Sequence, residues 1–122
     1  MIIEDLATEL ENTAEWRSEK TEQFPDDPRN AEAADLLMKV AANLRSIDGT
    51  PEAKRFEALH DFVFAEGTLD ETSDAFRLCE RWNEYRSRIG FDHYPDSGKE
   101  YLDDLMDIAF ETLPSTRYLD TQ

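Results

Sequence analysis

The first pattern that could carry chemistry is a glutamate three positions before a histidine, Glu57 and His60. Residues at this spacing share a helix face, so both side chains could hold one metal ion. Helical di-metal sites use this motif twice and add two inward-facing glutamates. The second histidine, His93, has Gly90 at the matching position, so the motif occurs once. We therefore expect no cofactor. An alternative is a helical-bundle enzyme whose metal ion is held by carboxylates, Glu57 among them, and by His60.

Two further side chains are candidates for acid/base or nucleophilic chemistry. His93 lies between Asp92 and Asp96, which is typical of a polar turn before a helix. Cys79 is the single cysteine, so it cannot form an intramolecular disulfide. Because Glu80 is its neighbour and no histidine is near in sequence, we expect a small apolar residue and not a nucleophile. These patterns favour a protein without enzymatic activity.

The clearest candidate binding surface is a set of acidic residues near the C-terminus. Four of them recur at helical 4-3-4 spacing with a fifth beside them: Glu100, Asp104, Asp107, Glu111 and Asp103. Like charges at these spacings destabilise a helix by about 0.2–0.5 kcal/mol per pair. Solvation or a basic partner must offset that cost. We therefore interpret these five residues as an acidic ridge that is a candidate interaction surface.

A basic set comes just before this ridge. Arg77, Arg81 and Arg88 can share a helix face, with Arg86 nearby. Basic residues near a helix C-terminus interact favourably with its dipole. In an antiparallel hairpin they would also pair with the acids of the following helix. The sequence leaves two alternatives open, a charge-matched hairpin or an exposed acidic ridge.

The elements that must position these residues are helices. The glycines and prolines fall into four gaps or the final stop, and the segments between them show apolar residues at helical spacing. We expect helices over about 3–23, 28–47, 51–66, from 70 or 72 to 89, and from about 97 to 113. Thr50 is the expected N-cap of the third helix, and Gly49 should end the second in a left-handed conformation.

The fold class follows from these segments. No stretch alternates with period two over the length of a strand. The prediction is an all-α protein, a compact bundle of about five helices, four of them long, with short connections and no sheet. Residues 1–114 should form a single helical domain, and residues 115–122 a flexible C-terminal tail.

Composition narrows the classes of partner. The 122 residues include 29 acidic and 13 basic ones, a net charge of -16 shared equally by the two halves. Such a chain should bind neither nucleic acid directly nor an anionic membrane surface. Its first residues carry no basic segment and no long apolar run, which predicts no secretory signal. A cytoplasmic location is the expectation.

These observations favour a small acidic helical protein that acts by binding another protein with a basic surface. Aromatic residues beyond the main apolar stripes could form part of a partner or homodimer surface: Trp16, Phe24, Phe62, Phe64 and Phe76. An alternative is a nucleic-acid mimic that inhibits a DNA- or RNA-binding protein by occupying its basic groove. Carboxylates every three or four helical residues lie about 4.5–6 Å apart along the axis, which is comparable with phosphate spacing.

Overall fold

A computed structural model describes residues 2–64, 71–89 and 94–113. Their helices are α1 (Ile2–Gln23), α2 (Arg29–Ile47), α3 (Pro51–Phe64), α4 (Asp74–Ile89) and α5 (Gly98–Thr112). Within these ranges there is no strand, and the predicted all-α bundle is confirmed. None of these helices is long and apolar enough to cross a membrane. His93 and the predicted tail over 115–122 lie outside the described residues.

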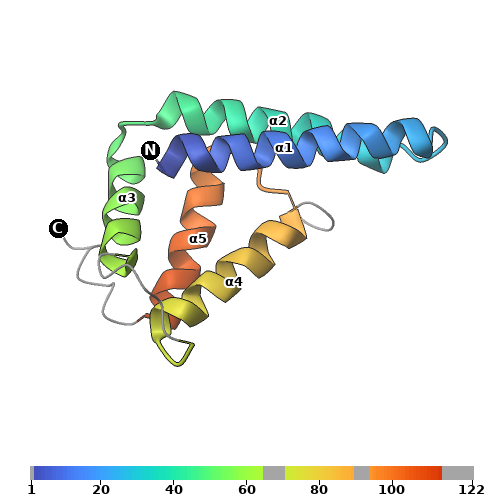
Figure 1. Cartoon of the computed structure of the whole chain (residues 1–122). Coiled ribbons are helices and arrows are strands. Elements are labelled where there is room, and N and C mark those ends of the chain that lie inside the picture. The colour runs from blue at the N-terminus through green and yellow to red at the C-terminus, as the bar shows by residue number, and fades with distance from the viewer. Residues whose placement is uncertain (1, 65–70, 90–93, 114–122) are drawn as a thin grey trace.

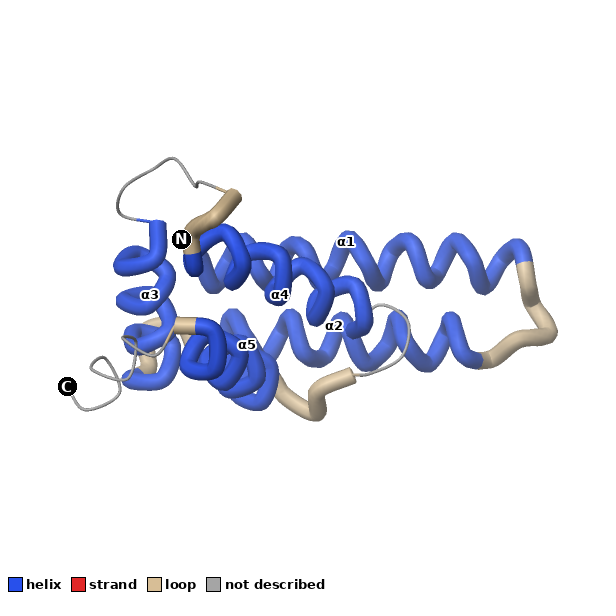
Figure 2. The backbone as a smooth tube through the Cα atoms, turned by 90° about the horizontal axis from the view of Figure 1, so that it is seen from below, coloured by secondary structure: helices blue, strands red, loops and turns tan. Residues whose placement is uncertain are grey.

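The framework is a long antiparallel hairpin of α1 and α2 (Figure 1). Helix α3 runs across the end of the hairpin where α1 begins and α2 ends. Helices α4 and α5 pack on one side of the same half of the hairpin, and α5 contacts α2, α3 and α4 (Figure 2). The other end of the hairpin therefore projects beyond the remaining helices.

Small side chains let the hairpin helices approach closely. Ala7 and Ala14 of α1 and Ala34 and Ala41 of α2 are buried in the core. Near the projecting end Arg17 Nη1 donates a 2.8 Å hydrogen bond to Oδ1 of the buried Asn30. The buried part of the interface between α1 and α2 is thus apolar apart from the Arg17–Asn30 hydrogen bond near the projecting turn.

Local hydrogen bonds decide where the helices begin and end. Gly49 adopts a φ of +87°, so its predicted left-handed conformation is confirmed. Helix α2 begins at Arg29, one residue later than predicted, because the Glu32 N–H donates to the Pro28 carbonyl oxygen at 3.1 Å and so makes Pro28 the residue before the helix. Helix α4 begins at Asp74 and not at 70 or 72, because the Ser73 hydroxyl accepts from the Phe76 N–H at 3.0 Å.

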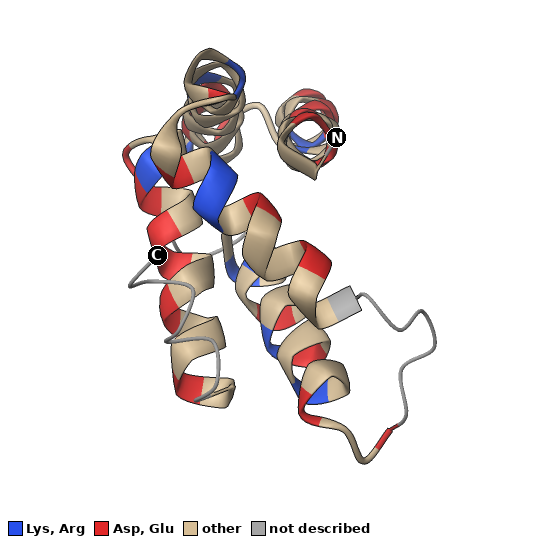
Figure 3. Cartoon of the chain, turned by 90° about the vertical axis from the view of Figure 1, so that its left-hand side faces the viewer, with Lys and Arg blue, Asp and Glu red and all other residues tan. Residues whose placement is uncertain are grey.

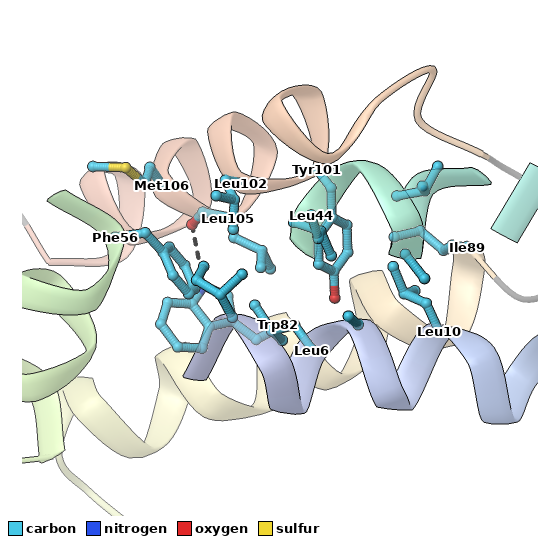
Figure 4. Packing of buried hydrophobic residues seen from close by; sticks show 14 of the residues in the cluster. Leu6, Leu10, Leu44, Phe56, Trp82, Ile89, Tyr101, Leu102, Leu105 and Met106 are labelled. Atoms are coloured by element: carbon cyan, nitrogen blue, oxygen red, sulfur yellow. Dashed lines mark hydrogen bonds between the residues drawn. The ribbon is translucent and has the colours of Figure 1, made fainter. Parts of the chain in front are cut away.

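The core lies where α1, α2, α3, α4 and α5 meet (Figure 4). Trp82 of α4 is 4% exposed, and its indole Nε1 donates to the Leu105 carbonyl oxygen of α5 at 3.2 Å. Phe56 of α3 packs against the same indole with ring centroids 5.7 Å apart. A buried indole N–H without an acceptor would be costly, so this bond holds α4 against α5 in one orientation.

A second close contact joins α5 to α2. Ser97 caps α5 by accepting from the Glu100 N–H at 3.1 Å. The next residue, Gly98, donates its N–H to Asn43 Oδ1 at 2.5 Å. A Cβ on Gly98 would lie 2.7 Å from the backbone nitrogen of Leu44, so α5 meets the backbone of α2 at a position that admits no side chain.

Gly98→Ala should lower the free energy of unfolding by about 1–3 kcal/mol, because the added methyl group collides with rigid backbone. Urea unfolding followed by circular dichroism measures the change. Gly49 is the control, since a Cβ there meets nothing within 4 Å and only its positive φ resists substitution. Asparagine tolerates a positive φ, so it allows the two positions to be compared with the same side chain. Gly49→Asn should lower the free energy of unfolding less than Gly98→Asn does, and equal losses would contradict the steric explanation.

Tyr101 of α5 carries a polar atom, its hydroxyl oxygen, into the core. Its side chain is 0% exposed and stacks on Tyr85 with ring centroids 5.9 Å apart. Its hydroxyl has no hydrogen-bond partner among the described residues. By contrast, the Tyr85 hydroxyl donates to the Asp104 carboxylate. Burial raises the pKa of both phenols well above its usual value, so both remain neutral.

Tyr101→Phe should raise the free energy of unfolding by about 1 kcal/mol, since it removes an unsatisfied buried hydroxyl and keeps the ring. Tyr85→Phe is the matched control and should lower stability, because Asp104 loses a donor. The measurement is again chemical denaturation. A Tyr101→Phe protein less stable than the parent would show that the hydroxyl has a partner.

Candidate functional site

The five acidic ridge residues do not share one environment. The Glu100 carboxylate accepts from the Asp96 N–H at 2.8 Å, and Asp104 accepts from the Tyr85 hydroxyl. Glu111 pairs with Arg81 of α4 at 3.0 Å. Asp103 and Asp107 are exposed. The ridge is therefore partly engaged by its own fold and partly open to solvent, so each of the two alternatives holds for some of its members.

The arginines of α4 point toward three different elements. Arg81 bonds to α5 through Glu111 and the Thr112 hydroxyl. Arg77 pairs with Asp74 of its own helix, and Arg86 with Glu9 of α1 at 3.0 Å. Arg88 lines an open groove of about 340 Å³ between α4 and α5, together with Asp104 and Asp107 among others. Among the described ion pairs, the one between Arg81 and Glu111 joins α4 to α5, and it confirms the predicted pairing for this arginine.

Many of the other basic side chains also bond to acidic ones within the chain. Arg45 of α2 contacts Glu4 at 3.1 Å and Glu11 at 2.6 Å, and its hydrogen bonds hold the pKa of Glu11 below the usual value. Further ion pairs join Arg29 to Asp27, Lys39 to Asp35 and Lys99 to Glu52. Because acidic residues outnumber basic ones, this pairing leaves a surplus of carboxylates. Figure 3 shows the acidic positions along the helices.

Glu57 and His60 lie on α3 as predicted, in different surroundings. A carboxylate oxygen of Glu57 is buried and has no hydrogen-bond partner among the described residues. Nδ1 of His60 lies 3.7 Å from a carboxylate oxygen of Asp61. Across residues 2–64, 71–89 and 94–113, no three His, Cys, Asp or Glu side chains gather closely enough to hold a metal ion. The described geometry therefore supplies no ligand set around this pair.

Sequence reasoning missed a cavity of about 280 Å³ between α1, α3 and α4. It brings together His60 and Cys79, which lie far apart in the sequence. Its lining comes from three helix faces: Ile2, Asp5, Leu6 and Glu9 of α1, Phe56 and His60 of α3, and Cys79, Trp82, Asn83 and Arg86 of α4. The 3–4 spacing of the α4 residues predicts their common face, but only the crossing of the helices creates the cavity.

The charged groups around this cavity are held in place by one another. Arg86 donates to Glu9 at 3.0 Å and to the Asn83 side-chain oxygen at 3.1 Å. Burial raises the pKa of the Cys79 thiol, and the nearby Arg86 charge opposes that shift. The thiol is therefore protonated at neutral pH, whereas a catalytic cysteine needs a lowered pKa. The arrangement suits binding better than nucleophilic chemistry.

Comparison with protein-family models, curated proteins and solved structures finds no match for this chain. The functional argument therefore depends on the geometry and charge described above.

Alkylation of Cys79 by iodoacetamide at pH 7 should be slower in the folded protein than in urea, because its raised pKa lowers the thiolate fraction. The rate constants can be followed by mass spectrometry of the intact protein. Raising the pH should increase the folded-state rate until the thiol has titrated. A folded protein that reacts faster than the unfolded one at pH 7 would instead indicate an activated nucleophile.

Proposed function

We propose that this chain is a non-enzymatic binding protein whose partner is another protein with a basic surface. The observation that carries the proposal is the exposure of Asp103 and Asp107 on α5, while Arg81 of the neighbouring α4 is engaged by Glu111. These two carboxylates lie one helical turn apart. Neither makes a hydrogen bond or ion pair with another described residue, so a cationic partner can approach both.

The surroundings of these carboxylates support a protein partner. Asp107 lies on the rim of the groove between α4 and α5, next to the half-buried Ile108. An interface commonly surrounds an apolar contact with a charged rim. The net charge of -16 would also attract a basic protein over a distance and raise its rate of association. The same charge repels a second copy of this chain, which favours a different protein over a homodimer.

The exposed aromatic residues give weaker support. Trp16, Phe24 and Phe62 are 38%, 58% and 54% exposed. Phe24 lies at the projecting turn of the hairpin, whereas Phe62 lies on α3 at the opposite end of the molecule (Figure 1). Phe76 is half-buried, and the side chain of Phe64 is outside the described set. Separate exposed aromatic residues are common on protein surfaces, so charge remains the stronger argument.

The double variant Asp103→Asn/Asp107→Asn should weaken partner binding by about threefold to tenfold, because it removes two exposed charges and no internal contact. The partner is first identified by affinity purification from the cells that make the protein. Its binding is then measured by calorimetry at several salt concentrations. The control Asp26→Asn/Asp48→Asn changes two other exposed acids by the same total charge. Equal weakening by both double variants would contradict a binding surface on α5.

The nucleic-acid mimic is a narrower form of this proposal. Asp103, Asp107 and Glu111 follow one another along α5 at spacings of about 6 Å, comparable with phosphates. Duplex DNA should then displace the partner at low salt. Failure of that competition excludes the mimic and leaves the broader proposal intact.

A further inference from the structure

The cavity between α1, α3 and α4 has an apolar floor. Leu6, Phe56 and Trp82 line it and are at most 4% exposed (Figure 4). The indole N–H of Trp82 is already bonded to the Leu105 carbonyl oxygen of α5. The indole therefore offers the cavity an aromatic surface with no unmet hydrogen-bond donor. Such a floor favours an aromatic or branched apolar group of a ligand.

The rim of the cavity is polar, and its available charge is negative. Arg86 is bonded to Glu9 and Asn83, so its guanidinium is engaged by groups of the rim itself. Asp5 lines the same rim, is exposed, and makes no hydrogen bond or ion pair with the described residues. Only one side-chain oxygen of Glu9 bonds to Arg86. Asp5 and Glu9 are one helical turn apart on α1, so both can accept from one cationic group.

We propose that this cavity binds a small primary amine that carries an aromatic or branched apolar group. The apolar group packs on Phe56 and Trp82, and the ammonium donates to the carboxylates of Asp5 and Glu9. A volume of about 280 Å³ is large enough for a ligand of this size. An anionic ligand is disfavoured, because Arg86 is already paired and the whole protein is strongly acidic. The proposal is independent of a protein partner at α5.

The test compares two probes with the same ring and opposite charge, phenethylamine and 3-phenylpropionate. Two-dimensional NMR of the ¹⁵N-labelled protein should show phenethylamine shifting the amides of Asp5, His60 and Asn83 and the indole N–H of Trp82. The dissociation constant should be about 1 mM or below, within reach of so small a ligand. The carboxylate probe should leave these signals in place. Similar shifts with both probes, or none with the amine, would overturn the proposal.

Asp5→Asn should weaken phenethylamine binding by about threefold to fivefold, since it removes an exposed charge partner. The matched control is Asp26→Asn, which makes the same charge change at the far end of the hairpin. Its affinity for phenethylamine should equal that of the parent. A loss as large as that of Asp5→Asn would show that the net charge alone causes the effect and would contradict a direct contact with Asp5. Circular dichroism verifies that both variants are folded.

Cys79 supplies a second readout that needs no variant. It is the single cysteine and lines the cavity, so occupancy should slow its alkylation. Phenethylamine should lower the alkylation rate in proportion to the bound fraction measured by NMR, and 3-phenylpropionate should not. An unchanged rate at saturating amine would place the amine elsewhere and overturn the proposal.

Discussion

The close approach of α5 to α2 at Gly98 is the constraint on which the other helix positions depend. Without a side chain at this residue, the first turn of α5 lies directly against the backbone of Leu44. Helix α5 then contacts α2, α3 and α4, and the Trp82 indole holds α4 to it. Because α4 packs on α5, it leaves space beside α1 that the Arg86–Glu9 ion pair spans. The cavity is thus a consequence of where α5 meets the hairpin.

Local sequence signals predicted the helices well because those signals are themselves local. Apolar spacing marked five segments, and Gly49, Thr50 and Ser97 act at helix ends as their chemistry suggests. The sequence predicts too early a start for α4, because Thr72 and Ser73 are both capable caps and the structure uses Ser73. Choices of this kind depend on packing beyond the local segment.

The surfaces were harder to predict than the helices. Spacing correctly placed Glu100, Asp104, Asp107 and Glu111 on one helix, but it could not show that α4 would engage Asp104 and Glu111 and leave Asp107 exposed. Similarly, His60 and Cys79 belong to helices whose crossing is set by α5. Sequence periodicity describes one helix at a time, whereas a cavity or an ion pair between helices requires their relative positions.

The projecting end of the α1–α2 hairpin has a consequence for how this protein opens. Between residues 15 and 36 it carries seven acidic and three basic residues, and it extends beyond the other three helices. Its packing comes from alanines and the Arg17–Asn30 hydrogen bond, which bury less apolar area than the leucines and aromatic residues of the core. We therefore expect this segment to be less stable locally than the core, so that its amide protons exchange with solvent through openings that leave the α5-centred core folded.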